Sequence, residues 1–162
     1  MFAQGQKIIY GNHGVCVIED VILRKDALLG EKLSYLILLS SGLTAYVPVD
    51  SPVFMRELLS KEEAEEAIRA FPSVELQSFT GSNSKALADR YRAILGRHVP
   101  TELFCLYKSL KQKIALAVES GKRPGAMDER YSALALTTAV EELAEVLECP
   151  APEILRRLGI EE

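Results

Sequence analysis

Two histidines, three cysteines and several paired glutamates are the residues of this 162-residue chain that could do chemistry. Neither His13 nor His98 lies at ligand spacing from another histidine, a cysteine or a carboxylate pair, so no metal site is expected. The adjacent Glu62-Glu63 and Glu65-Glu66 follow a helix start, where a solvated helix face explains them better than an acid–base pair. The sequence shows no nucleophile motif and no phosphate-binding loop. We therefore expect no catalytic residue, no cofactor, no small-molecule substrate and no enzyme activity.

The cysteines indicate a compartment and no chemistry of their own. They are odd in number and far apart, which fits neither a zinc motif nor a disulfide framework (Cys16, Cys105 and Cys149). Free cysteines of this kind usually pack as small core residues in a reducing environment. The first residues show no signal-peptide pattern, and the longest apolar run, at 35–39, is far shorter than the roughly 20 residues that a membrane span needs. We expect a soluble cytoplasmic protein without membrane contact.

Basic residues interleaved with tyrosines are the remaining candidates for a binding surface. They lie in the second half of the chain (Lys85, Arg90, Arg92, Arg97, Lys108, Lys111 and Lys113, with Tyr91 and Tyr107 among them). Such a set suits nucleic acid, although the tyrosines suit a helix-packing face equally well. The net charge of the chain is only −4, and residues after 70 comprise 12 basic and 13 acidic residues. Any nucleic-acid contact is therefore expected to be local, or assisted by a partner.

Short strands are predicted for the first third of the chain. Residues 7–10, 15–21, 33–39 and 43–47 are rich in side chains that suit a half-buried sheet, and turn formers separate them. Pro48 cannot donate to a ladder, so the last of these strands is expected at an edge. Four or five short strands with tight turns predict a small, strongly bent sheet or open barrel.

The hydrophobic period becomes helical from Ser60 onward. Ser60-Lys61-Glu62-Glu63 forms a capping box that starts a first helix, and Pro72 limits its end. Further helices are expected at about 84–95, from Pro100 to before Gly121, at about 128–147, and in a short stretch to Leu158. The sequence thus predicts an α+β protein with a β-rich domain at 1–60, a first helix and linker at 61–83, and an all-α helical bundle at 84–162. Residues 72–83 are expected to form the linker and domain boundary.

Three segments of the first third resemble the CarD-like transcription regulators and the polymerase-interaction domain shared with transcription-repair coupling factors. They are Gly5-Gln6-Lys7-Ile8-Ile9-Tyr10, Asn12-His13-Gly14-Val15-Cys16-Val17-Ile18-Glu19 and Leu43-Thr44-Ala45-Tyr46-Val47-Pro48-Val49. The resemblance implies a Tudor-like open barrel that binds the β subunit of bacterial RNA polymerase. One departure is Gly11, where the family usually has proline; both are turn residues, so the local geometry is expected to survive.

The resemblance also implies polymerase-binding residues. The family's basic residue after the second strand corresponds to Arg24-Lys25, and its following apolar contact falls near Leu28. A second basic residue of the family falls at Tyr46, beside Pro48, where a tyrosine can still anchor an interface. An added strand along the edge of the sheet is a sensible mode for this contact.

The helical part carries a weaker resemblance to the same family. Asp89-Arg90-Tyr91-Arg92 resembles its basic helix, ahead of which a tryptophan wedges into the minor groove at the edge of the transcription bubble. This chain has no tryptophan, and the wedge position falls at Leu87 in one alignment and at Ser84 in another. The DNA-contacting candidates are Lys85, Leu87, Arg90, Arg92, Lys108 and Lys111.

Two functions remain as expectations. In the first, the protein is a non-enzymatic regulator that docks on the polymerase β subunit and holds its helical domain near upstream promoter DNA, which alters open-complex stability. Tethering would let a near-neutral domain act on DNA, and the protein would be associated with the bacterial nucleoid through the polymerase. In the second, the helical domain makes protein contacts only, which the missing tryptophan and the neutral charge favour.

Overall fold

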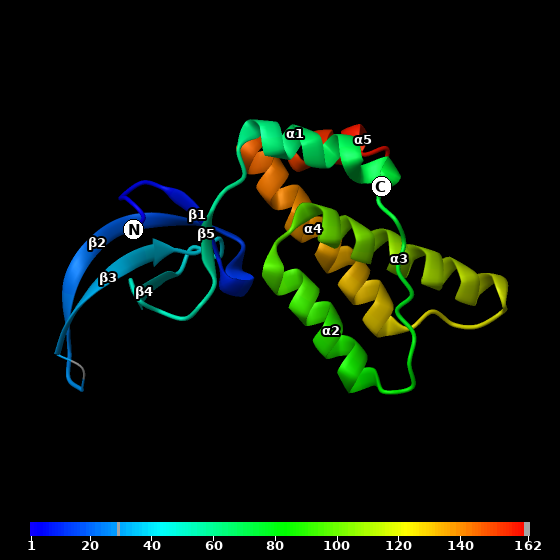
Figure 1. Cartoon of the computed structure of the whole chain (residues 1–162), viewed down its shortest axis with the longest axis horizontal. Helices are drawn as coiled ribbons and strands as arrows, with labels where there is room; N and C mark the ends of the chain where they lie inside the picture. The colour runs from blue at the N-terminus through cyan, green and yellow to red at the C-terminus, as the bar shows by residue number, and fades with distance from the viewer. Residues whose placement is uncertain (29, 161–162) are drawn as a thin grey trace. The chain divides into compact units, whose positions relative to one another are not determined.

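The computed structural model describes residues 1–28 and 30–160, and it divides the chain into two compact units. The first unit, Met1–Leu58, holds the strands, and the second, Leu59–Glu162, holds the helices (Figure 1). We call them the sheet unit and the helical unit. The predicted α+β class, with a small bent sheet followed by helices, is confirmed.

The sheet unit is an antiparallel meander whose last strand returns beside the first. Its strands are β1 (Lys7–Tyr10), β2 (Val15–Asp26), β3 (Gly30–Leu38), β4 (Thr44–Pro48) and β5 (Met55–Glu57), in the order β4-β3-β2-β1-β5. The sheet bends strongly along β2 and β3 (Figure 1), and a bulge shifts the β2–β3 register between Ile18 and Asp20. No ladder joins β4 to β5 within the described residues, so both strands remain edges of an open sheet.

Alternating apolar residues of four strands form the core on the inner face of the bent sheet. Its buried members are Ile8, Cys16, Ile18, Tyr35, Ile37 and Val47. The N-terminus packs on this core, since the Phe2 backbone N–H donates to the Tyr35 hydroxyl at 3.1 Å and the two rings lie 5.7 Å apart. The predicted strands are therefore present, but β2 and β3 extend farther toward their shared turn than the sequence indicated.

A 3-10 turn, η1 (Gly11–His13), follows β1 and depends on glycine at its first position. Gly11 has φ of +46°, its N–H donates to the Phe54 carbonyl at 2.7 Å, and an added Cβ would meet Val53 at 3.1 Å. Proline has φ near −65° and no N–H, so it cannot take this conformation. The turn as it stands in this chain therefore requires a residue other than proline at position 11.

The helical unit packs five α-helices around two clusters. They are α1 (Lys61–Ala70), α2 (Ser84–Arg97), α3 (Pro100–Glu119), α4 (Ala126–Leu147) and α5 (Ala151–Arg157), with a 3-10 turn η2 (Phe71–Ser73) after α1. The antiparallel pair α3 and α4 runs through both clusters: one end packs against α1 and α5, and the other against α2. The predicted capping box is present, because Ser60 Oγ accepts from the Glu63 N–H and the Glu63 side chain accepts from the Ser60 N–H.

The domain boundary lies earlier than predicted. The division falls between Leu58 and Leu59, so α1 belongs to the helical unit, and residues 72–83 run inside that unit. Phe79 is only 3% exposed and packs on Tyr91, which fastens this segment to the helices. Polar composition suggested a linker here, but one buried aromatic side chain makes the segment part of the core.

Candidate functional site

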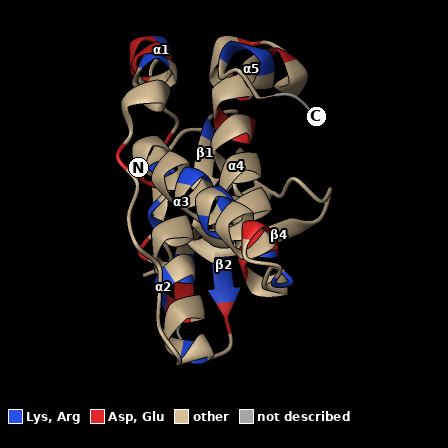
Figure 2. Cartoon of the chain, turned by 90° about the vertical axis from the view of Figure 1, so that its right-hand side faces the viewer, with Lys and Arg blue, Asp and Glu red and all other residues tan. Residues whose placement is uncertain are grey.

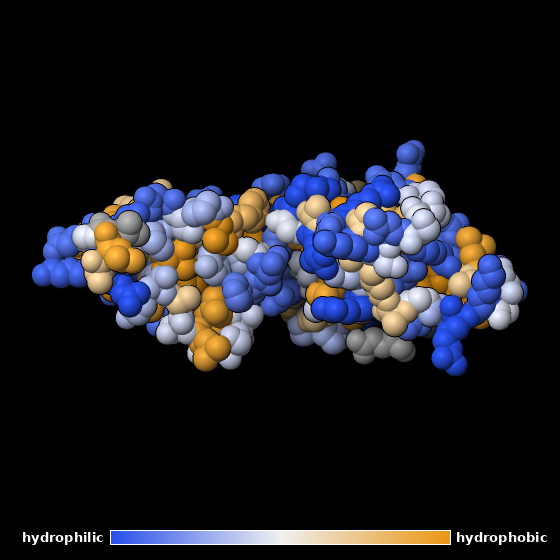
Figure 3. Space-filling model, turned by 90° about the horizontal axis from the view of Figure 1, so that it is seen from below, coloured by the Kyte–Doolittle hydropathy of each residue, from blue (hydrophilic) through white to orange (hydrophobic). Residues whose placement is uncertain are grey.

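The outer face of the sheet unit brings together three of the five residues predicted for polymerase binding. Ser34 of β3 pairs in register with Ile22 of β2 and with Pro48 of β4. Arg24 lies two residues after Ile22 on β2, and Tyr46 lies two residues before Pro48 on β4. One face of the sheet therefore carries the side chains of Ile22, Arg24, Ser34, Tyr46 and Pro48. Figure 3 shows that hydrophobic residues reach the surface of the sheet unit.

Arg24 and Tyr46 form a single recognition element on this face. The guanidinium carbon lies 4.0 Å from the centroid of the Tyr46 ring, which is a cation–π contact. Ser34, between them in register, is only 4% exposed, whereas Tyr46 is 47% exposed. Arg24 has no carboxylate partner within the described ranges, so its charge is available to an acidic group of another molecule. We call Arg24, Tyr46 and Pro48 the arginine–tyrosine face.

The other two predicted contacts lie elsewhere. Lys25 pairs with Glu31 in register and points to the opposite face from its neighbour Arg24. Leu28 lies in the β2–β3 turn, where it is 93% exposed and its N–H donates to the Asp26 side chain at 2.8 Å. The structure therefore does not gather Lys25 and Leu28 with the arginine–tyrosine face.

The backbone of β4 offers an edge for an added strand beside that face. Leu39 N–H donates to the Leu43 carbonyl and Val49 N–H to the Leu33 carbonyl, so the hydrogen-bonded rows of β4 are the odd-numbered residues. The N–H and C=O groups of Thr44 and Tyr46 consequently point outward from the sheet. Pro48 contributes only a carbonyl, so a partner strand can receive two N–H donors along this edge.

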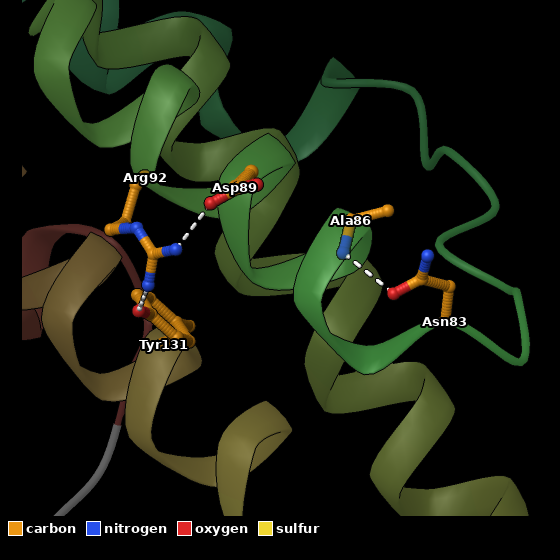
Figure 4. A network of polar contacts seen from close by, with 5 residues as sticks. All are labelled: Asn83, Ala86, Asp89, Arg92 and Tyr131. Carbon is orange, nitrogen blue, oxygen red and sulfur yellow. Dashed lines mark hydrogen bonds and ion pairs between the residues drawn. The ribbon is translucent and has the colours of Figure 1, made fainter.

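In the helical unit, the two predicted arginines of α2 hold parts of the unit itself. Arg90 stacks over Phe79 at 4.3 Å and donates to the Ser78 carbonyl at 3.3 Å. Arg92 forms an ion pair with Asp89 and donates to the Tyr131 hydroxyl at 3.1 Å (Figure 4). The Asp89 carboxylate raises the pKa of the Arg92 guanidinium. Both arginines are exposed, but each has internal partners that a phosphate would have to replace.

Lys108, predicted as a DNA contact, makes hydrogen bonds inside the helical unit. Its Nζ donates to the carbonyls of Phe71 at 2.9 Å, Val74 at 3.1 Å and Pro72 at 3.4 Å. The Phe71 carbonyl also accepts from the Val74 N–H at 3.3 Å, so the Lys108 ammonium adds to the backbone hydrogen bond that closes η2. Lys108 therefore caps the α1–η2 junction.

Neither predicted position supplies an exposed apolar wedge. Leu87, predicted as one of two wedge positions, is 8% exposed and packs in the cluster with Phe79 and Tyr91, so it presents no apolar surface to bases in this structure. Ser84 is exposed at the first turn of α2, beside Asn83, whose side chain accepts from the Ala86 N–H at 3.1 Å (Figure 4). Ser84 has no apolar surface to insert between bases.

The predicted basic residues do not form one patch. Lys85 is exposed on α2, whereas Lys111 is exposed on α3 and lines a groove formed with α4 and α5. The sequence analysis missed a different set of cations, Lys122, Arg123 and Arg130, at the turn from α3 to α4, which we call the cationic turn. All three are exposed, and none has a carboxylate partner in the part of the chain that the structure describes. Gly121 and Gly125 mark this turn and were the signal that could have identified it.

Searches for a metal cluster and for a membrane-spanning helix found neither among the described residues. Among them, no three metal-ligating side chains come together, and no helix has the length and apolarity that crossing a bilayer requires. His13 stacks on Tyr10 with ring centroids 5.4 Å apart, and His98 is buried.

The sheet unit thus combines an open sheet, a free edge and an exposed cation–aromatic pair. Residues 2–59 match the family model described as the CarD-like/TRCF RID domain, so the sheet unit belongs to this family of RNA polymerase-interacting domains. The match ends at the observed boundary between the units. A comparison with curated proteins finds no significant match.

Proposed function

We propose that the protein is a non-enzymatic transcription regulator whose sheet unit binds the β subunit of RNA polymerase. The observation that carries the proposal is the arginine–tyrosine face beside the free edge of β4, within a domain of the RID family. An extended strand of the polymerase adds to β4, and Arg24 meets an acidic side chain of that strand. Tyr46 supplies apolar area and holds the guanidinium in place.

Calorimetric titration of a polymerase β-subunit fragment that carries its outer lobes tests this contact. We expect saturable one-to-one binding. Arg24→Glu should weaken it by at least tenfold, because the new carboxylate would be buried without a partner and would face the acidic side chain of the polymerase strand as a like charge. Lys25→Glu is the matched control, since it reverses the neighbouring charge on the opposite face and should leave affinity within about threefold. Equal effects of the two reversals, or no binding of the wild-type protein, would place the contact elsewhere.

The helical unit acts on promoter DNA near the upstream edge of the open complex, and the cationic turn carries that contact. Lys122, Arg123 and Arg130 support this part of the proposal because they are exposed and have no internal carboxylate partner. Tethering through the sheet unit raises the effective concentration of a weak DNA binder. The protein alters the lifetime of the open complex without inserting a side chain between bases.

Open-complex lifetimes on a promoter fragment, measured with polymerase across a salt series, test the DNA contact. Charge reversal at Lys122 and Arg123 should abolish the effect of the protein on the lifetime while leaving its affinity for the β-subunit fragment unchanged. Arg156→Glu on α5 is the control for a general change in charge and should leave the effect intact. A lifetime effect that survives the first pair of reversals would refute a DNA role for the cationic turn.

A second candidate function is an interaction module whose helical unit contacts proteins only. The burial of Leu87 and the internal partners of Arg90 and Lys108 favour it, since the predicted DNA-contacting set is largely engaged in the fold. Crosslinking to promoter DNA in the presence of polymerase separates the two candidates. A helical unit that never crosslinks to DNA, in a protein that still binds polymerase, supports the second.

A further inference from the structure

The two units are joined by a very short stretch of backbone. Glu57, the last residue of β5, pairs in register with Ile8 of β1 and belongs to the sheet unit. Ser60 is the N-cap of α1 and belongs to the helical unit. Only Leu58 and Leu59 lie between them, and the units divide at the peptide bond that joins these two leucines. Consecutive Cα atoms lie about 3.8 Å apart, so the stretch from Glu57 to Ser60 spans roughly 11 Å when fully extended.

The sheet side of this connection is held within its own unit. The Glu57 carbonyl accepts from the Arg56 guanidinium at 2.8 Å, and the Glu57 carboxylate accepts from the Gln6 side-chain amide at 3.3 Å. These side chains are exposed, so pairing of β5 with β1 is the stronger constraint. Together these contacts fix the direction in which the chain leaves the sheet.

A buried carboxylate anchors the helical side of the connection. Glu142 of α4 is only 4% exposed, and its side chain accepts from the Leu59 N–H at 3.0 Å. The two residues are 83 positions apart, so this bond ties the entry of α1 to a helix much later in the chain. A carboxylate is buried without a large penalty only where hydrogen bonds replace its lost solvation. Glu142 therefore holds the first N–H group of the helical unit.

Other features fix the angle at which the chain enters α1. The capping box engages both the hydroxyl and the backbone N–H of Ser60 with Glu63. Leu59 precedes the N-cap and packs on the cluster that contains Ala64, which is the arrangement of a hydrophobic staple. Carboxylates gather on α1 (red in Figure 2), and those of its first turn complement the helix dipole. Leu59 and Ser60 thus belong firmly to the helical unit, which leaves Leu58 as the joint.

We propose that Leu58 is a one-residue hinge and that Glu142 is the positioning residue that keeps the hinge this short. The inference rests on the proposed function, because it concerns how a sheet unit docked on polymerase presents the helical unit to promoter DNA. A joint of one residue confines the cationic turn to a narrow range of directions. The effective concentration of a tethered binder falls once its linker becomes longer than the distance it must span. The short hinge thus offsets the near-neutral charge of the helical unit.

Nuclear magnetic resonance relaxation of the full chain tests the anchor without polymerase or DNA. The Leu59 amide should be as rigid as the helices, with an order parameter of about 0.85. Glu142→Ala should lower that value toward about 0.6, because the N–H loses its acceptor. Glu142→Gln keeps a carbonyl acceptor and should leave it near the wild-type value. A Leu59 amide that is mobile in the wild-type protein, or that Glu142→Ala leaves unchanged, would overturn the anchoring role.

Inserting the sequence Gly-Ser-Gly-Ser after Leu58 tests the positioning role, because it lengthens the joint and leaves both anchored sides in place. Affinity for the β-subunit fragment should stay within about threefold, while the effect on open-complex lifetime should fall by about fivefold or more. The same insertion between Gly81 and Ser82, in an exposed loop of the helical unit, is the matched control and should leave both measurements unchanged.

The outcomes separate the hinge from the proposed function. A lifetime effect that survives the insertion after Leu58 refutes the hinge while the proposed function stands. A lifetime effect that the control insertion reduces equally also refutes it, since the loss then follows from any lengthening of the chain. A wild-type protein that neither binds the fragment nor changes the lifetime refutes the proposed function, and the positioning role with it.

Discussion

Replacing Lys108 with methionine should destabilise the helical unit without acting through DNA. The substitution keeps the apolar stem but removes the ammonium that donates to the Phe71, Pro72 and Val74 carbonyls. A hydrogen bond from a charged donor contributes about 1.5–3 kcal/mol where water is excluded. The side chain is half-buried and water can reach some of these carbonyls, so we expect a loss of about 2 kcal/mol for the set.

Thermal and urea unfolding followed by the helical circular dichroism signal measure this loss, because the α-helices of the described residues all belong to the helical unit. For a unit of this size, 2 kcal/mol lowers the melting temperature by about 10 °C. Lys111→Met is the matched control on the same helix: Lys111 is exposed, it has no ion pair within the described residues, and its ammonium lies 5.9 Å from the centroid of the Tyr107 ring. Its stability should stay within about 0.5 kcal/mol of wild type. A Lys108→Met protein as stable as wild type, yet with altered promoter binding, would refute the capping role.

Three further predictions concern the backbone, a buried carboxylate and high pH. Gly11→Pro should destabilise the sheet unit by about 3 kcal/mol or more in thermal unfolding, since it loses the donor to Phe54 and cannot reach φ of +46°. Glu142→Ala should lower the free energy of unfolding in urea by about 2 kcal/mol, because the Leu59 N–H, which donates to the Glu142 carboxylate at 3.0 Å, loses its acceptor. Burial raises the pKa of the Tyr91 hydroxyl, so the folded protein keeps a proton that the unfolded chain loses near pH 10. Stability should be full below about pH 10 and fall above it, and Tyr91→Phe should flatten that fall in a urea series across this range.

The strands of the sheet unit were predictable wherever apolar residues alternate. The distal part of the β2–β3 hairpin was missed because Arg24, Lys25 and Asp26 have no apolar period and are held only by cross-strand pairing. The bulge between Ile18 and Asp20 was equally invisible, and it sets which side chains share the outer face. A resemblance could name Arg24 and Tyr46, but only the folded register shows that they meet on one face.

The burial of Leu87 was already indicated by the sequence. Leu87, Tyr91 and Ile94 recur at helical spacing, which is the pattern of a core-facing stripe. Alignment with a family motif assigned an exposed role to the first member of that stripe. The internal contacts of Arg90 and Lys108 were harder to predict, because both side chains donate to backbone carbonyls. Carbonyl positions depend on tertiary structure, so residue identities alone do not reveal them.

Net charge was the weakest guide to what this protein binds. The near balance of 12 basic and 13 acidic residues after residue 70 suggested a domain without preference for nucleic acid. Exposed charges act over about 8 Å at physiological salt, so a partner senses the local set and not the sum. Lys122, Arg123 and Arg130 form no ion pair within the described residues, although Glu119, Asp128 and Glu129 lie in the same stretch of chain and Asp128 is paired with Lys113. A near-neutral domain with exposed cations that form no ion pair on one turn can therefore still make a weak phosphate contact once a partner tethers it near DNA.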